Sequence, residues 1–401
     1  MRVLFGATAG GAVLALTAAL LGPSAAGAHG TGRAAVDADS AVIALGDSFI
    51  SGEAGRWRGN GNTPDGSAYG TDLATIPSSC DETEESCAND PHRVYGDTYD
   101  PAGKNGCDRS VWSEITYAES VKVGGVDYAI PKANRLNAAC SGATTEAVVK
   151  DGFKGEKAQT TTLRQHAASK KVRMVVLSIG GNDIGFGAII ADCMKGFMEG
   201  SIFGWHCHEY HDPDIDGMKE RVRGAVRAIR STMKTAGYAK DSYRLVLQSY
   251  PAPIPRGGEF RYQESGYDRY TYGGCPFWDD DATWAHDTLV PKIADALRDL
   301  ATEESKTGEG DVGFLDLRRA LAGHEACAKA PVGQSVPGNT LSNPRSEATS
   351  EWVRYYGGWV EPQGQEQETL HPNFYGQKRL GACLNQLATR ADRVYSCPQP
   401  S

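Results

Sequence analysis

Short apolar runs alternate with segments of helical periodicity along most of this chain. Buried strands are predicted where such runs occur, at residues 41–45, 133–140, 172–179, 243–249 and 312–317. The run at 172–179 is almost continuously apolar, which is typical of a strand covered on both faces. Apolar residues spaced three to four apart predict helices at about 110–122, 157–169, 217–236, 283–304 and 373–391. Strands that alternate with helices predict βαβ units and a central parallel sheet.

Long polar segments separate these elements. Residues 51–105 are rich in Gly, Asp, Asn and Ser and are too long for an ordinary connection, so we expect a binding loop held by cysteines. Residues 190–215 are predicted to be an irregular insertion, and residues 256–282 and 323–366 are predicted to be loops. Since we find neither a linker nor an internal repeat, residues 29–401 are expected to form a single α/β domain with long loop insertions.

Three of the predicted strands end in small-residue turns that could carry chemistry. The turns contain Ser48 in Gly-Asp-Ser, Gly142 in Cys-Ser-Gly-Ala, and Asn182 in Gly-Gly-Asn-Asp. Because the carboxyl ends of parallel strands meet at one edge of the sheet, where ligands bind in α/β folds, we expect these turns to converge. Ser48 is the predicted nucleophile. The backbone N–H groups of Ser48 and Gly142 and the side-chain amide of Asn182 are the predicted oxyanion donors.

A serine hydroxyl needs a neighbouring base before it becomes a useful nucleophile. The best candidate is His371, which lies in Glu-Thr-Leu-His-Pro-Asn just before the last predicted helix. Glu368 precedes the histidine by three residues, so one turn of chain would place both side chains together. We therefore predict that Glu368 orients His371 in a Ser-His-acid arrangement.

The bulk composition narrows the class of protein. The chain has 401 residues, 40% of them hydrophobic, and a net charge of -9. Without a basic stripe, nucleic acid is not expected as a partner. The ten cysteines indicate an oxidising compartment and a disulfide framework. Sequence alone does not determine the pairing, but proximity suggests Cys107 with Cys80 or Cys87, along with Cys193–Cys207, Cys275–Cys327 and Cys383–Cys397.

Residues 1–28 have the features of a targeting segment. A positive Arg2 precedes an apolar stretch from Val13 to Leu21 and a small-residue site at Ala26–Ala28. The alternative, a membrane anchor, is weaker because glycines interrupt the stretch and it falls short of the ~20 residues that a span needs. We therefore expect a secreted, monomeric protein without an integral membrane segment.

Two motifs suggest a metal, and both have simpler explanations. His206-Cys207-His208-Glu209-Tyr210-His211 resembles half of a zinc site, but no second ligand pair matches it in the sequence. Asp212, Asp214 and Asp216 resemble the start of a calcium loop, but Arg223 occupies the position of its final glutamate. The aspartates are better explained as caps of the helix at 217–236. We expect neither a metal nor another cofactor.

Taken together, four blocks resemble those of the GDSL, or SGNH, serine hydrolases. They are Gly46-Asp47-Ser48, the Gly142 turn, Gly181-Asn182-Asp183 and His371-Pro372-Asn373, in the family's order. The cysteine-rich form is similar to extracellular lipases and esterases of actinobacteria. The resemblance implies a three-layer α/β/α sandwich of flavodoxin-like type and hydrolysis of carboxylic esters through an acyl-enzyme. One departure is Glu368, where the family usually has Asp; some similar esterases orient the histidine by a backbone carbonyl instead.

The expected substrate is a small-molecule or lipid ester, which a lipase, esterase or phospholipase would cleave. A carbohydrate O-acyl esterase would use the same chemistry in a wetter pocket. A protein of another class, a secreted binding protein that has lost catalysis, would not need Ser48, Asn182 and His371 to be intact.

Overall fold

The computed structural model describes residues 35–60, 71–81, 88–96, 105–200, 204–329, 346–356 and 366–400. These segments belong to one compact unit, Ala34–Ser401. The targeting segment predicted at residues 1–28 and the cysteine at position 87 lie outside the described residues. Within the described ranges, none of the helices combines the length and the apolar character that a membrane span requires.

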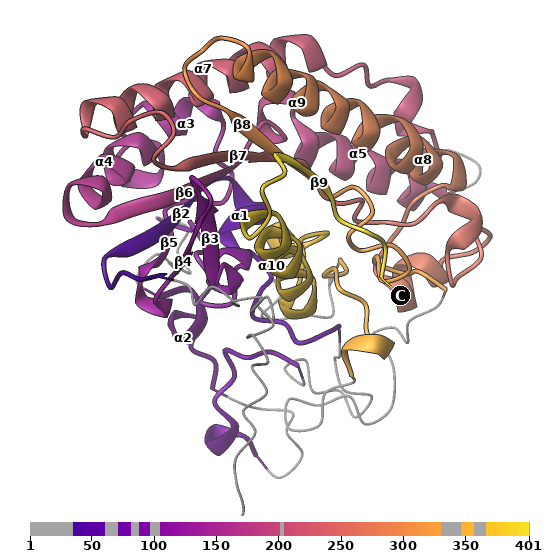
Figure 1. The fold of residues 1–401 in the computed structure, drawn as a ribbon. Helices are drawn as coiled ribbons and strands as arrows, with labels where there is room; N and C mark the ends of the chain where they lie inside the picture. Colours follow the sequence, from indigo (N-terminus) through magenta and orange to yellow (C-terminus); the bar gives the residue numbers. More distant parts are fainter. Residues whose placement is uncertain are drawn as a thin grey trace, which may run out of the picture. The chain divides into compact units, whose positions relative to one another are not determined.

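A six-stranded sheet lies at the centre of the fold, and all of its strands run parallel (Figure 1). Its order is β5-β2-β6-β7-β8-β9. The strands are β2 (Ser40–Gly46), β5 (Arg135–Asn137), β6 (Lys171–Ser178), β7 (Arg244–Gln248), β8 (Val312–Asp316) and β9 (Val394–Ser396). In chain order this is the arrangement 2-1-3-4-5 of flavodoxin-like folds, extended by a sixth strand. The predicted parallel sheet is therefore confirmed.

Helices cover both faces of this sheet, which gives the predicted three layers. One group contains α3, α4, α7 and α9, which contact one another and the strands β2, β6, β7 and β8 (Figure 1). The other face carries α10, which packs on a short turn at 114–117 and on β8 and β9. The longer helices are α4 (Gln159–Ser169), α5 (Phe186–Met198), α7 (Ile215–Thr235), α9 (Val290–Ser305) and α10 (Phe374–Ala388). The shorter ones are α1 (Ser48–Ser51), α2 (His92–Tyr95), α3 (Thr145–Val149) and α8 (Asp279–Trp284).

The prediction of a helix at 110–122 is wrong. A 3-10 turn, Glu114–Tyr117, is followed by β3 (Ser120–Val123), which pairs antiparallel with β4 (Val126–Ala129). Together with β1 (Ala35–Val36), these strands form a second, three-stranded sheet. Burial alternates along β3, with Val121 and Val123 inward, so its strand period competes with the helical spacing.

The prediction of an irregular insertion at 190–215 is also wrong in its first half, because α5 continues to Met198. Apolar residues recur every four positions along this helix, at Phe186, Ile190, Met194 and Met198, which is the spacing of one helical face. The cysteine and glycine among these residues obscured the period in the sequence.

Four disulfides are described in the structure. Cys193–Cys207, Cys275–Cys327 and Cys383–Cys397 are paired as predicted. The proposed partner of Cys107 is wrong, because Cys107 is bonded to Cys140. This bridge joins two loops that are 33 residues apart in sequence but adjacent at the sheet edge.

The core of the sheet predicts a stability difference between two substitutions. Leu247 in β7 is fully buried between β6 and β8, so Leu247→Ala should lower the free energy of unfolding by about 2–5 kcal/mol. Val126 in β4 is 45% exposed, and Val126→Ala should change the free energy of unfolding by no more than about 0.5 kcal/mol. Urea denaturation of the oxidised proteins measures both values. Equal losses of unfolding free energy in the two variants would show that the packing of β7 contributes no more to stability than an exposed position does.

Candidate active site

The turn after β2 is built around a glycine that no other residue could replace without moving the chain. Gly46 has a φ of +136°, and a Cβ there would lie 1.9 Å from the carbonyl oxygen of Ser178 at the end of β6. The side-chain amide of Gln159 on α4 donates to the carbonyl of Gly46 and accepts from its N–H. These contacts fix the chain direction just before Ser48.

Ser48 and His371 are in direct contact. Ser48 begins α1, and its Oγ lies 2.7 Å from Nε2 of His371, which comes from the loop before α10. Nδ1 of the same ring lies 3.0 Å from the carbonyl oxygen of Thr369. Since a carbonyl can only accept, Nδ1 carries the proton and Nε2 is free to accept from the Ser48 hydroxyl. This is the geometry that a nucleophile and its base require.

The loop that carries His371 has a strained backbone. Leu370 has a φ of +60°, which residues with a side chain seldom adopt. Its N–H donates to the carbonyl of Arg354, and the carbonyl of His371 accepts from the N–H of Arg354. These two bonds hold the loop against the segment at 352–354, so the Thr369 carbonyl stays directed at the imidazole. Strain of this kind is characteristic of functional sites.

The predicted contact between Glu368 and His371 is wrong. Glu368 is 1% exposed, and its carboxylate accepts hydrogen bonds from Arg56, Trp57 and Tyr95 at 2.7–3.2 Å. Although burial would raise its pKa, the Arg56 charge and these three donors outweigh burial and hold the pKa below its usual range. The alternative given above, in which a backbone carbonyl orients the histidine, matches the observed contact between the Thr369 carbonyl and His371.

Two of the three predicted oxyanion donors, Gly142 and Asn182, lie on loops that are bonded to each other. The Asn182 amide donates to the carbonyl of Ala143 at 2.9 Å, which leaves its second hydrogen available. Asp183 accepts from the backbone N–H of Thr145 at 3.0 Å and from its hydroxyl at 2.5 Å. Gly142 precedes this contact and has a φ of +76°. Of the three predicted donors, Ser48 and Asn182 line the central cavity described below, whereas Gly142 is not among its lining residues.

A buried tyrosine connects the nucleophile turn to the Asn182 turn. The Tyr250 hydroxyl donates to the carboxylate of Asp47 and accepts from the N–H of Gly181. Asp47 also caps α1 by accepting from the N–H of Phe49 at 3.2 Å. Burial raises the pKa of Asp47 to about 7, while the tyrosine bond opposes that rise. The carboxyl edge of β2, β6 and β7 is thus joined by one chain of hydrogen bonds.

Sequence reasoning missed a second acidic group close to the histidine. Glu53 is 1% exposed, and one carboxylate oxygen accepts from the Ser141 hydroxyl at 2.6 Å and lies 3.8 Å from Nε2 of His371. Burial, with the charge of Asp108, raises the pKa of Glu53 well above its usual range. Burial likewise raises the pKa of Asp108 to about 6. No periodicity marks Glu53 in the sequence, because its burial depends on contacts from distant loops.

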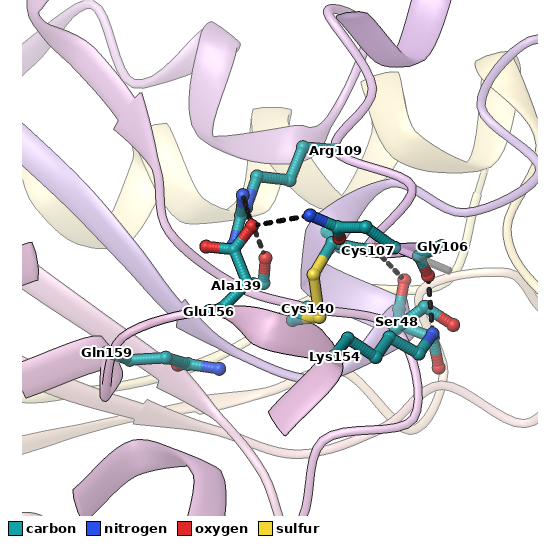
Figure 2. The surroundings of a disulfide bond; sticks show 12 residues. Ser48, Gly106, Cys107, Arg109, Ala139, Cys140, Lys154, Glu156 and Gln159 are labelled. Carbon is teal, nitrogen blue, oxygen red and sulfur yellow. Dashed lines mark hydrogen bonds and ion pairs between the residues drawn. A yellow bond between two sulfur atoms is a disulfide. The ribbon is translucent and has the colours of Figure 1, made fainter. Parts of the chain in front are cut away.

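The Cys107–Cys140 disulfide holds these loops in place (Figure 2). Cys107 precedes Asp108, and Cys140 precedes Ser141, so one covalent bond sets the distance between the two partners of Glu53. Lys154 donates to the carbonyl of Gly106 at 2.5 Å, and Arg109 forms an ion pair with Glu156 at 3.1 Å (Figure 2). Lys154 lowers the pKa of Glu53 and Asp108, but burial outweighs its charge.

A cavity of about 370 Å³ opens beside Ser48. Its polar lining includes Asn182 and His371, and most of its remaining walls are apolar. One wall is the repeating face of α5, formed by Phe186, Ile190, Met194 and Met198. The other apolar residues of the lining include Phe49, Tyr250, Val290, Ile293 and Leu370. The volume and the largely apolar lining are those of a small-molecule site, and Ser48 and His371 are both part of that lining.

The acidic motif at 212–216 has the role predicted for it, whereas the histidine motif at 206–211 has a neighbour that was not predicted. Asp214 caps α7 by accepting from the N–H of Gly217 at 2.8 Å, so the cap predicted for this acidic run is present. His206 and His208 lie near a third residue, Asp281, that the sequence gave no reason to group with them.

The solved structures to which this chain is similar include a lipase, a phospholipase and an acetylesterase. An extracellular lipase from Streptomyces rimosus is 19% identical, covering 87% of this chain and 100% of that chain, with a TM-score of 0.45. A phospholipase A1 from Streptomyces albidoflavus NA297 is 19% identical over 87% and 99% of the two chains, with a TM-score of 0.40. A carbohydrate acetylesterase from Sinorhizobium meliloti is 10% identical over 86% and 96%, with a TM-score of 0.32. No curated protein matches this chain.

The family comparison covers more than half of the chain. Residues 116–379 match the GDSL-like Lipase/Acylhydrolase family. The match contains Gly142, Asn182 and His371 but begins after Ser48, whose position rests on the geometry described above. The chain therefore belongs to the GDSL-like Lipase/Acylhydrolase family and is a carboxylic ester hydrolase.

Proposed function

We propose that this protein is a secreted hydrolase of esters with apolar acyl chains, and that it acts through an acyl-enzyme on Ser48. The observation that carries the proposal is the 2.7 Å contact between Ser48 Oγ and His371 Nε2, two residues that line a largely apolar cavity. Secretion is supported by the four disulfides, which persist in oxidising compartments, and by the targeting pattern of residues 1–28.

The proposed reaction begins with attack of Ser48 Oγ on the carbonyl carbon of the ester. His371 Nε2 takes the hydroxyl proton, and the negative charge that develops on the carbonyl oxygen is stabilised by the N–H groups of Ser48 and Gly142 and the amide of Asn182. His371 then returns the proton to the departing alkoxide, so the alcohol leaves and the acyl group remains on Ser48. Water, deprotonated by the same histidine, releases the acid and restores the hydroxyl.

In this reaction, the Thr369 carbonyl is the positioning group for His371. By accepting from Nδ1–H it holds the ring with Nε2 directed at Ser48. Glu53 is proposed to position the Gly142 loop through Ser141, because its carboxylate accepts a hydrogen bond from the Ser141 hydroxyl. Glu368 is assigned a structural role, because its carboxylate is fully engaged with Arg56, Trp57 and Tyr95.

The catalytic pair can be distinguished from the structural glutamate by mutation. Ser48→Ala and His371→Ala should each lower kcat on a chromogenic ester by several orders of magnitude, on the order of 10⁴–10⁶. Glu368→Gln should keep kcat within about tenfold but lower the free energy of unfolding by about 3–5 kcal/mol, because Arg56 loses a buried partner. Initial rates, labelling by an organophosphonate and urea denaturation measure these effects. Labelling or full activity in Ser48→Ala would refute the mechanism.

The apolar wall of α5 predicts a preference for long acyl groups. With a rise of about 1.5 Å per residue, the four wall residues extend about 18 Å from the Asn182 turn. On esters from acetyl to palmitoyl, kcat/KM should rise roughly threefold to fourfold per methylene until the wall is covered. Ile190→Trp should remove the gain for long chains and spare the acetyl ester, whereas Met198→Trp, at the far end, should affect only the longest. Deacetylation of a glycan without cleavage of long-chain esters would support the carbohydrate esterase instead.

The acid limb of the reaction should be displaced from the usual range of histidine. Burial lowers the pKa of His371 to about 4, compared with ~6.5 in an unfolded chain. Since the base must be neutral, kcat/KM should stay level down to about pH 5 and fall as the pH drops through about 4. As the pH falls from ~6.5 towards 4, His371 becomes protonated in the unfolded chain before it does so in the folded protein. Titration of this residue should therefore lower the free energy of unfolding over that pH range. An acid limb centred near pH 6.5, with the fold intact by circular dichroism, would contradict the assignment.

A further inference from the structure

Two histidines and a buried aspartate meet at a point outside the proposed active site. His206 and His208 flank Cys207 at the 3-10 turn Cys207–Glu209, which contacts α8, the helix that carries Asp281. Ligand-type atoms of the three side chains lie within 4.8 Å of one another. Asp281 is 1% exposed, whereas the side chain of His206 is 37% exposed, so the cluster has both a buried anchor and a route to solvent.

Two buried polar atoms in this cluster have no hydrogen-bond partner. They are Oδ2 of Asp281 and Nδ1 of His206, and they lie 3.9 Å apart. A buried carboxylate oxygen left unpaired is costly, so its position calls for a ligand. Two atoms that each bind one zinc ion at about 2.1 Å lie up to about 4.2 Å apart, and the observed separation falls within that limit.

The other half of the Asp281 carboxylate is already oriented. Oδ1 accepts from the backbone N–H of His208 at 3.0 Å and from Nδ1 of its ring at 2.7 Å. The aspartate therefore lies between the two imidazoles before any ion arrives. An ion that binds Nδ1 of His208 needs the lone pair of that nitrogen, so the ring proton moves to Nε2 and the imidazole stays neutral.

The type of ligand indicates the type of ion. Two imidazoles with one carboxylate suit zinc, cobalt or nickel rather than calcium or magnesium, which prefer oxygen ligands. We propose that His206, His208 and Asp281 bind one divalent cation of the zinc class, with solvent completing its coordination. This supersedes the expectation of no metal, which rested on the lack of a second ligand pair: Asp281, more than 70 residues away in the sequence, supplies the missing ligand.

The position of the site suggests what the ion does. Cys207 is bonded to Cys193 on α5, next to Met194 of the cavity wall. α8 continues through the π-helical turn Ala285–Leu289 into α9, whose Val290 lines the same cavity. The ion would therefore hold α5 and α9, two helices that line the cavity, in place without contacting the reacting groups. Binding of the ion does not depend on the proposed function.

The test uses the full-length oxidised protein after treatment with a chelator. Titration with Zn²⁺ by calorimetry should show one equivalent bound, with a rise in the thermal unfolding midpoint, and Co²⁺ should produce a visible absorption band. Binding should weaken as the pH falls from 7 to 5, because protons compete for the imidazoles. Asp281→Asn and His206→Gln should each lose the bound equivalent and the cobalt band.

His211→Gln is the matched control. His211 lies on the same segment but is paired with Asp192 at 3.1 Å and stands outside the cluster, so this variant should bind like the unmodified protein. If Asp281→Asn fails to fold by near-UV circular dichroism, His206→Gln decides, since that side chain is partly exposed. Absence of binding to the unmodified protein, binding that survives in His206→Gln, or loss of binding in His211→Gln would each overturn the proposal.

Discussion

The arrangement of the site depends on one close approach, between the turn after β2 and the last residue of β6. Only a glycine at position 46 allows the chain to pass the Ser178 carbonyl, and the next residue donates its N–H to that same oxygen. This contact lies between the first and third strands of the sheet in chain order, the point at which the strand order of flavodoxin-like folds reverses and leaves a crevice. Ser48 and Asn182 follow these two strands, so the fold brings them together before any side-chain interaction contributes.

Buried acids around this crevice are stabilised in two different ways. Glu368 stays ionised because Arg56 and two further donors replace its lost hydration. Glu53 and Asp108 lie where burial outweighs the nearest positive charge, so the pKa values of both carboxyls lie above their usual range. The two environments place the acids differently, because the Glu53 carboxyl lies 3.8 Å from Nε2 of His371, whereas the Glu368 carboxylate is bonded to Arg56, Trp57 and Tyr95.

The sequence was informative where local patterns determine the structure. Continuous apolar runs identified the strands at the sheet centre, the turns after them identified Ser48 and Asn182, and the motif before the last helix identified His371. It was less informative where two periods overlap, as in β3, or where cysteine and glycine interrupt a helical face, as in α5. The partner of Glu368 could not be predicted, because Arg56 is 312 residues away in the sequence. Spacing between a carboxylate and a histidine gives their distance along the chain, but it does not account for competing donors from another loop.

The orientation of His371 by a main-chain carbonyl has a consequence for how this site tolerates change. Every residue type has a carbonyl, so no substitution of the Thr369 side chain can remove the group that accepts from Nδ1. In a Ser-His-Asp site, a single codon change can delete the orienting acid. Here the equivalent loss requires a change in the path of the main chain, such as release of the strained conformation at Leu370. Selection on this part of the site should therefore act on loop geometry rather than on the identity of one side chain.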